Sequence, residues 1–362
     1  MSMSENNGSS GVVKFGIIGC GYISKKWIAA IESAGHQIVA VASRNKLENA
    51  KNYQKLCKKS NPHAYDDYDA LLEHAGMDAV YFSLPTALRT TWVLKAINKG
   101  FHVLVEKPMN GEAEVRKIIN AAKENKVQLM DCVMFMHSLR LRALSDQKRA
   151  LSDQKLKQEI GSIRRVTSSF GTGPMPKDNI RYNPILEPYG ALGDLGWYNI
   201  RVSLWAFGYD LPTHVSCIQI GETENKAIEN VQGWLHYSDG RMASFDCEFN
   251  NGCTRQWAMV CGTKQQLYIP NFVVQKETDS FSTIVSSWGD FDKGKFDVDD
   301  QVQTVNIPQH CQEAECIKTF AALTKSVDNE FWSSVILKTQ VVLDACLSSI
   351  KNNGVPTKVA SL

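Results

Sequence analysis

The chain has 362 residues, more than one hydrophobic core usually organises, so two domains are expected. Its hydrophobic fraction of 43% and charged fraction of 22% are ordinary for a soluble globular protein. A net charge of +2 gives no electrostatic surface for nucleic acid or an anionic membrane, which fits an enzyme of small molecules.

Residues 1–11 are polar and contain no apolar core, so they predict a disordered tail and not a signal peptide. No stretch approaches the run of about 18 apolar residues that a membrane span requires. The ten cysteines are scattered without a CxxC pair, which indicates reduced thiols and no metal site. We therefore expect a cytoplasmic protein without a membrane partner.

Short apolar runs alternate with helical segments over the first third of the chain. The runs cover residues 12–18, 37–42, 77–84, 101–105 and 127–135. Near-continuous apolar strands that alternate with helices are typical of a parallel sheet covered on both faces. The pattern predicts an α/β fold with a doubly wound, dinucleotide-binding Rossmann domain over residues 12–134.

The pattern changes from about residue 161. Two partly alternating runs, 231–237 and 241–249, flank Ser238-Asp239-Gly240, which is a hairpin signal. Further strands are predicted over 214–220, 256–261 and 266–269. Together they indicate an antiparallel sheet with one packed face, in a substrate-binding α+β domain over residues 135–362. Residues 335–351 form an amphipathic helix that is expected to close the fold.

Residues 142–148 are repeated directly as residues 149–155. Seven residues are nearly two helical turns, so the copy lengthens a helix without turning its face much. We predict a solvated helix, with an interaction surface as the alternative.

A glycine turn follows the first strand. Gly19 permits a tight turn, and Gly21 lets the backbone approach a pyrophosphate. The helix that begins at Tyr22 and Ile23 then offers free N–H groups to the phosphates. The third position of the motif is Ser24, which is small but not glycine, so slightly looser packing of helix on strand is expected.

The end of the second strand indicates which dinucleotide binds. An NAD enzyme commonly has an acidic residue there, which binds the ribose 2′-hydroxyl. This chain has Ser43 and Arg44, and no carboxylate that would repel a 2′-phosphate. We predict NADP. The alternative is that Arg44 and Lys46 are ordinary surface cations.

The fourth strand ends in Glu106, Lys107 and Pro108. A lysine at a buried strand end needs a partner. A Glu106–Lys107 ion pair that caps the sheet edge is one explanation. However, the carboxyl end of a parallel strand faces the cofactor crevice, so we favour a functional role.

Several motifs resemble the glucose–fructose oxidoreductase and inositol dehydrogenase (Gfo/Idh/MocA) family. They are the glycine turn and residues 78–85, 100–108 and 190–198. Residues 134–140 and 179–181 are most similar to the dimeric dihydrodiol dehydrogenase and plant-type oxidoreductase branch. The resemblance covers nearly the whole chain. It implies a large, mostly antiparallel open sheet in the second domain, through which a homodimer forms.

The resemblance also implies catalytic roles. Lys107 would hydrogen-bond the reacting oxygen, Tyr198 would shuttle the proton, and Asp194 would orient Lys107 or the substrate. A tyrosine beside a lysine cation is expected to have its phenolate favoured. The alternatives are that Asp194 caps a helix and that Tyr198 is an interface aromatic. Further cofactor contacts are expected at Leu84, Pro85, Thr86 and Glu106.

Four residues are candidates for binding the substrate: His137, Arg140, Arg181 and Trp197. The two arginines suit a hydroxylated or anionic substrate, or alternatively form structural ion pairs. Trp197 offers a flat apolar wall. The family usually has a histidine where this chain has Arg89, which either touches the substrate or caps the next helix.

These patterns predict hydride transfer between NADP and a hydroxyl-bearing carbon of a sugar, polyol or trans-dihydrodiol. Two alternatives remain. One is a non-catalytic NADP-binding sensor, which has no need of a lysine and tyrosine proton relay. The other is a glycoside hydrolase that uses bound nicotinamide transiently.

Overall fold

The computed structural model describes residues 11–44, 46–145, 158–275, 279–288, 298–326 and 330–362. Most of the predicted tail and the whole second copy of the repeat, residues 149–155, lie outside these residues. The predicted division at residue 134 falls at the start of a short 3-10 helix, η1 (Met134–His137).

The first part of the chain forms a six-stranded parallel sheet in the order β3-β2-β1-β4-β5-β6. Its strands are β1 (Lys14–Ile18), β2 (Gln37–Ala42), β3 (His63–Tyr65), β4 (Ala79–Phe82), β5 (His102–Val105) and β6 (Leu129–Asp131). This is the strand order of a Rossmann sheet, and it confirms the predicted doubly wound domain. The order reverses between β1 and β4, and in a Rossmann sheet this reversal places the cofactor crevice at the carboxyl ends of these strands.

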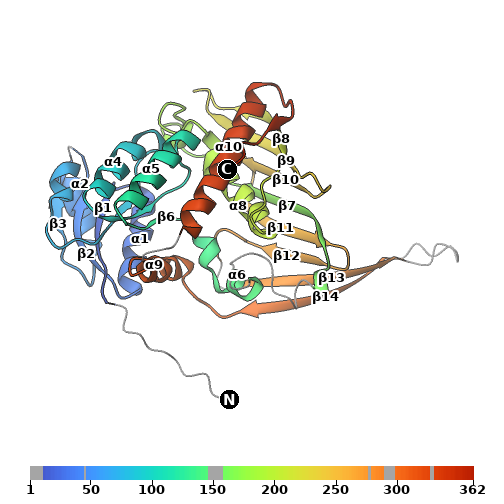
Figure 1. Cartoon of the computed structure of the whole chain (residues 1–362), viewed down its shortest axis with the longest axis horizontal. Helices are drawn as coiled ribbons and strands as arrows, with labels where there is room; N and C mark the ends of the chain where they lie inside the picture. The colour runs from blue at the N-terminus through green and yellow to red at the C-terminus, as the bar shows by residue number, and fades with distance from the viewer. Residues whose placement is uncertain (1–10, 45, 146–157, 276–278, 289–297, 327–329) are drawn as a thin grey trace, which may run out of the picture.

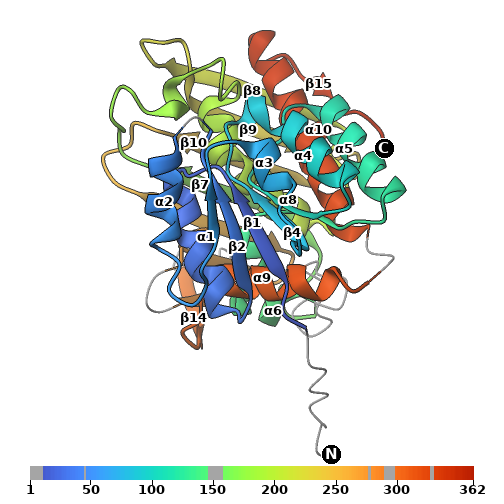
Figure 2. The same cartoon turned by 90° about the vertical axis from the view of Figure 1, so that its left-hand side faces the viewer.

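Helices cover both faces of this sheet (Figure 2). They are α1 (Tyr22–Ser33), α2 (Leu47–Gln54), α3 (Tyr68–Leu72), α4 (Thr86–Asn98) and α5 (Glu112–Glu124). In Figure 2, α1 and α2 lie to one side of the strands, and α4 and α5 lie to the other. The strands are therefore buried on both faces, which explains their near-continuous apolar sequences.

The second part forms a nine-stranded sheet in the order β14-β13-β12-β11-β7-β10-β9-β8-β15 (Figure 1). Every neighbouring pair is antiparallel except β7 and β10, so the sheet is mostly antiparallel, as predicted. Its strands are β7 (Ile163–Gly171), β8 (His214–Glu222), β9 (Ile228–His236), β10 (Met242–Glu248), β11 (Arg255–Gly262), β12 (Gln266–Pro270), β13 (Asp279–Trp288), β14 (Val298–Ile307) and β15 (Thr357–Lys358).

The two faces of this sheet differ in burial. Along β10, β11 and β12, buried residues alternate with partly exposed ones. The buried face packs against α8 (Trp197–Ala206) and α10 (Phe331–Lys351). The predicted hairpin is confirmed, because β9 and β10 pair directly across the Ser238-Asp239-Gly240 turn.

The end of the chain returns to the first sheet. Helix α9 (Gln312–Leu323) packs against α1, and Phe320 contacts the ring of Phe15 in β1. Helix α10 contacts β6 and α5 as well as β8. A single hydrophobic cluster therefore extends through both parts of the molecule.

The sequence was expected to contain no stretch that approaches a membrane span, but α10, alone among the described helices, has the length and apolar composition of one. More than half of its most apolar window is buried inside the protein. Its place between the two sheets is that of a core helix (Figure 1).

Candidate active site

The crevice begins at the glycine turn between β1 and α1. Gly19 has a positive φ of 99°, and an added Cβ would come within 3.0 Å of the backbone oxygen of Ser83. Ser24 is fully buried, and its hydroxyl bonds to the Gly19 carbonyl at 2.7 Å and to the Ser83 hydroxyl at 2.5 Å. The expected looser packing at Ser24 is therefore wrong, because its hydroxyl joins the helix to both strand ends.

The N-terminus of α1 opens toward this crevice. Its first residue, Tyr22, is 88% exposed. No side chain caps the helix, and its first turn contains no acidic residue. Its N–H groups and the positive end of its dipole are therefore available to an anionic group such as a pyrophosphate.

Ser43 and Arg44 follow the end of β2, beside this turn. The Gly19 N–H donates to the carbonyl of Ala42, which brings the glycine turn next to them. Ser43 is buried and accepts a hydrogen bond from the Asn49 amide at 2.9 Å, whereas Arg44 is exposed. The exposed guanidinium of Arg44 suits a phosphate, because the sequence at the end of β2 contains no carboxylate.

Two residues, Glu187 and Arg89, hold the loop after β4 in place. Thr86 is fully buried, and Glu187 accepts hydrogen bonds from its N–H at 3.1 Å and its hydroxyl at 2.5 Å. Arg89 donates from Nε to the Leu84 carbonyl at 2.7 Å, and from Nη1 to the Pro108 carbonyl. Arg89 thus fixes the chain after β4 and after β5, which was neither of the roles considered for it.

Lys107 lies at the carboxyl end of β5, where its side chain is 9% exposed. Its Nζ donates to the backbone oxygen and to Oδ1 of Asp194, both at 2.6 Å. Arg181 Nε donates to the other carboxylate oxygen of Asp194 at 2.6 Å. Lys107 is therefore paired with Asp194 and not with Glu106, and the carboxylate of Asp194 does not cap a helix.

Asp194 lies in a π-helical turn, η3 (Leu192–Gly196), that continues directly into α8. Burial by itself would raise the pKa of its carboxyl. The charges and hydrogen bonds of Arg181 and Lys107 outweigh burial, so that the pKa lies well below its usual range. Asp194 is therefore ionised at neutral pH and holds both cations.

Tyr198 lies in the first turn of α8, with the Lys107 ammonium 5.0 Å from its ring centroid. Its hydroxyl donates to the sulfur of Met134 at 3.6 Å. Burial, and then the negative charges of Glu106 and Asp194, raise the pKa of Tyr198 well above 10. The expectation of a favoured phenolate is therefore wrong: the phenol keeps its proton at neutral pH.

Glu106 turns into the protein interior. Its carboxylate accepts a hydrogen bond from the Tyr81 hydroxyl at 3.0 Å, and the residue is buried. Burial raises the pKa of Glu106, while the nearby charges of Lys107 and Arg89 oppose that shift. The Glu106 side chain supports the site from beneath and does not extend into the crevice as a cofactor ligand would.

Two family models match this chain. One is described as an oxidoreductase family with an NAD-binding Rossmann fold, and it matches residues 13–131. The other is the GFO/IDH/MocA C-terminal domain, which matches residues 150–268. The chain belongs to the Gfo/Idh/MocA oxidoreductase family.

Relatives within the Gfo/Idh/MocA family have several substrates. A D-xylose 1-dehydrogenase (NADP(+)) of Haloferax volcanii is 30% identical over 67% of this chain and 71% of its own. A trans-1,2-dihydrobenzene-1,2-diol dehydrogenase of Xenopus laevis is 30% identical over 72% and 76%. A 3-ketoreductase from Actinomadura kijaniata, crystallised with NADP and TDP-benzene, is 25% identical with a TM-score of 0.79, covering 94% of this chain and 98% of that one. The predicted family and fold class are confirmed.

Three of the four substrate candidates are buried in this Gfo/Idh/MocA protein. Trp197 is fully buried, and its indole N–H donates to Asp131 at 3.3 Å, so it forms no exposed wall. His137 is buried with its ring 4.6 Å from that of Trp332. Of the four, Arg181 is the residue that lies at the Lys107–Asp194 pair, with 40% of its side chain exposed.

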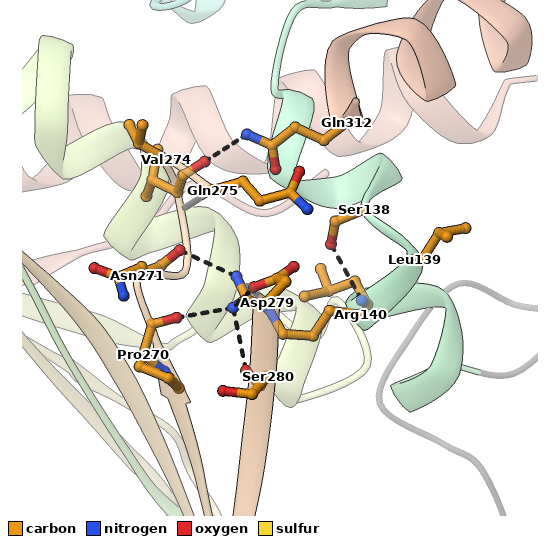
Figure 3. Close-up of polar contacts among 12 residues, drawn as sticks. Ser138, Leu139, Arg140, Pro270, Asn271, Val274, Gln275, Asp279, Ser280 and Gln312 are labelled. Carbon is orange, nitrogen blue, oxygen red and sulfur yellow. Dashed lines mark hydrogen bonds and ion pairs between the residues drawn. The ribbon is translucent and has the colours of Figure 1, made fainter. Parts of the chain in front are cut away.

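Arg140 is the third buried candidate, and Figure 3 shows its surroundings. It pairs with Asp279 and also donates to the carbonyls of Pro270 at 2.8 Å, Asn271 at 3.1 Å and Ser280 at 3.2 Å. These contacts hold the end of β12 and the start of β13 against α6 (Leu139–Leu144). Arg140 thus forms the structural ion pair that was its alternative.

The sequence did not indicate Glu187 or Asp131. Glu187 lies in an irregular segment between the motifs at residues 179–181 and 190–198, and it belongs to neither of them. Asp131 ends an apolar strand, and the reasoning that a buried charge needs a partner would have selected it, as it selected Lys107. Among the described residues, no group of three or more His, Cys, Asp or Glu side chains is arranged to hold a metal.

Proposed function

We propose that the protein is an NADP-dependent oxidoreductase that transfers a hydride between nicotinamide and a hydroxyl-bearing carbon of a sugar, polyol or trans-dihydrodiol. One observation carries the proposal. The Lys107 ammonium is held by Asp194 at the carboxyl end of β5, 5.0 Å from the ring centroid of Tyr198. The relatives that act on xylose and on a dihydrodiol support these two substrate classes.

The residues of the crevice fit NADP. The uncapped N-terminus of α1, without an acidic residue in its first turn, suits the pyrophosphate, and exposed Arg44 suits the 2′-phosphate. The loop at Leu84 and Pro85, fixed by Arg89, would border the nicotinamide end. When bound, NADP supplies the carbon that gives or takes the hydride.

Lys107 and Tyr198 divide the management of charge at the substrate oxygen. The Lys107 cation stabilises negative charge that develops on that oxygen as hydride arrives. The phenol of Tyr198 is protonated, so in the direction of carbonyl reduction it donates the proton. Its present acceptor, the Met134 sulfur, is a weak one that a substrate oxygen can replace.

Arg181 is the substrate-binding residue we retain. Its Nε is held by Asp194, and the part-exposed guanidinium has further donors for a substrate hydroxyl. Because Asp194 holds both Arg181 and Lys107, a hydroxyl bound by Arg181 would lie next to the reacting oxygen. A vicinal diol, as sugars and dihydrodiols have, matches that arrangement.

The open face of the second sheet supports a homodimer. One row of partly exposed residues crosses it, with Trp234 opposite Ser244 and Met259 opposite Tyr268. Large apolar side chains on a partly exposed sheet face are typical of a protein interface. Sedimentation velocity should give a dimer for the wild type and a monomer for Met259→Arg; a monomeric wild type would contradict this part of the proposal.

The function is tested by following NADPH absorbance, with aldoses, polyols and trans-dihydrodiols as substrates for oxidation and the corresponding carbonyl compounds as substrates for reduction. Wild type, Lys107→Met and Lys95→Met are compared, and NADPH binding is measured by fluorescence. Lys95 pairs with Asp69 on the surface, so its variant is a matched control. We expect turnover in wild type and Lys95→Met, and a loss of about 100-fold or more in Lys107→Met at unchanged NADPH affinity.

Tight NADPH binding without turnover of any compound would reject the dehydrogenase proposal. Hydrolysis of glycosides by the same protein would then indicate a nicotinamide-assisted hydrolase, and its absence a sensor. Full activity of Lys107→Met would instead reject the role given to Lys107.

A further inference from the structure

We propose that Asp131 is a positioning residue that sets the separation between Lys107 and Tyr198. The proposed function gives this separation its importance, and the inference rests on it to that extent. Asp131 ends β6, and the sheet register pairs it with Val105 of β5. Val105 stands two residues before Lys107, so Asp131 belongs to the part of the sheet that carries the lysine.

Helix α8 supplies three hydrogen bonds to the carboxylate of Asp131. Arg201 Nη2 donates to Oδ2 at 2.7 Å and Nη1 donates to Oδ1 at 3.4 Å. The Trp197 indole N–H donates to Oδ2 at 3.3 Å. Trp197 and Arg201 are four residues apart and therefore share one face of the helix, and Tyr198 lies between them in the sequence.

This link is completely buried. The side chains of Asp131 and Arg201 are both 0% exposed. Arg201 Nε also donates to the Thr339 hydroxyl of α10 at 2.8 Å, and the guanidinium lies 5.6 Å from the centroid of the Trp197 ring. A buried ion pair is weak evidence for stability, because apolar residues of similar volume often stabilise a fold as well or better. Its directional bonds do, however, fix how one element lies against another.

Two arms thus run from Asp131 to the site. One arm passes through the pairing of β6 with β5 to Lys107. The other passes through Trp197 and Arg201 to the first turn of α8, which carries Tyr198 and continues back into the η3 turn with Asp194. If the link is lost, α8 and η3 move relative to β5, and both partners of Lys107 move with them.

The experiment compares Asp131→Asn, Arg201→Lys and a matched control, Glu313→Gln. Asp131→Asn keeps the shape but leaves Arg201 without its charge partner. Arg201→Lys keeps the charge and tests whether a conservative change retains function. Glu313 is a buried carboxylate that joins α9 to α1 through Lys26, and it lies on neither arm.

Two measurements are made on each protein. The first is kcat and KM for a turned-over substrate, together with the NADPH dissociation constant. The second is the rate of acetylation of Lys107 by sulfosuccinimidyl acetate, followed by peptide mass spectrometry, with Lys95 as the internal reference. Lys107 is shielded beneath Asp194, so its labelling reports the position of η3 without any need for turnover.

For Asp131→Asn we expect kcat to fall about 10-fold to 100-fold, the scale of a displacement of about 1 Å at a reacting group. NADPH affinity should stay within about twofold, because none of the predicted cofactor contacts bonds to Asp131. Lys107 labelling should rise at least fivefold relative to Lys95. Arg201→Lys should give an intermediate loss, and Glu313→Gln should match the wild type.

Unchanged kcat and unchanged Lys107 labelling in Asp131→Asn would overturn the inference while the proposed function stands. Equal increases at Lys107 and Lys95, with NADPH binding lost, would assign Asp131 to overall folding and also overturn it. If no protein turns over any substrate, the proposed function fails on its own. The labelling ratio then decides the positioning role separately.

Discussion

Replacing Arg140 by methionine separates a structural role for this side chain from a role in substrate binding. The substitution removes the partner of Asp279 and three hydrogen bonds to the carbonyls of Pro270, Asn271 and Ser280. Breaking one side of a buried ion pair costs about 3–5 kcal/mol. We expect a loss in this range at pH 7, measured by urea unfolding followed by tryptophan fluorescence.

The loss should depend on pH in a defined direction. Burial raises the pKa of Asp279 even with Arg140 present, and without Arg140 the pKa will rise further. An acid whose pKa is higher in the folded state destabilises the fold when ionised, and this penalty disappears as pH falls through the folded pKa. The difference between wild type and Arg140→Met should therefore shrink between pH 7 and about pH 4, the ordinary value for aspartate.

A double variant controls for the charge. Arg140→Met with Asp279→Asn leaves no unpaired carboxylate, so it should recover part of the lost stability and lose the pH dependence. KM for any substrate should stay within about twofold of wild type in every variant that folds, because the guanidinium is buried and bound by Asp279 and backbone carbonyls. Unchanged stability with a greatly raised KM would refute the structural role and restore Arg140 as a substrate ligand.

Further results are expected at three residues of the candidate site. Arg44→Asp should weaken NADPH binding about 10-fold to 100-fold and leave NADH binding unchanged, because a carboxylate would face the 2′-phosphate. Equal NADPH affinities of wild type and variant in fluorescence titrations would mean that the phosphate lies elsewhere. Tyr198→Phe should lower kcat about 100-fold to 10,000-fold at constant NADPH affinity. In the wild type, carbonyl reduction should show no loss from phenol ionisation up to about pH 10, because the raised pKa keeps the proton on Tyr198; a fall below pH 8 that is absent from Tyr198→Phe would contradict this. Asp194→Asn should lower both kcat and stability at pH 7. Because the pKa of Asp194 is depressed in the folded state, acid removes its contribution to stability, and the difference from wild type should shrink as pH falls below about 4. A difference in urea unfolding that grows toward acid would contradict this.

The sequence predicted the fold well because its signals are local. Apolar runs between helical segments indicate buried parallel strands, and the Ser238-Asp239-Gly240 turn fixes a hairpin whatever surrounds it. Strand β3 has only three residues, and no apolar run marks β7 in full, so neither was predicted. Their assignment depends on neighbouring strands that are distant in the sequence.

The site was predictable in part for the same reason. Lys107 was found because a charged residue at a buried strand end is unusual by itself. The roles of Arg140 and Trp197 depend on Asp279 and Asp131, which are more than 60 positions away in the chain. The proton on Tyr198 likewise depends on how deeply the ring is buried, which a neighbouring lysine in a motif does not reveal.

The packing of α9 on α1 has a consequence for the order in which the protein can be completed during synthesis. Phe15 is among the first residues of β1, and one of its ring contacts is Phe320, near the end of the chain. Until residues 312–323 have left the ribosome, this part of the nucleotide-binding half lacks its cover and exposes apolar surface to water. A fragment that stops at residue 134 has the strands and motifs of a Rossmann domain but lacks α9, which shields one side of it.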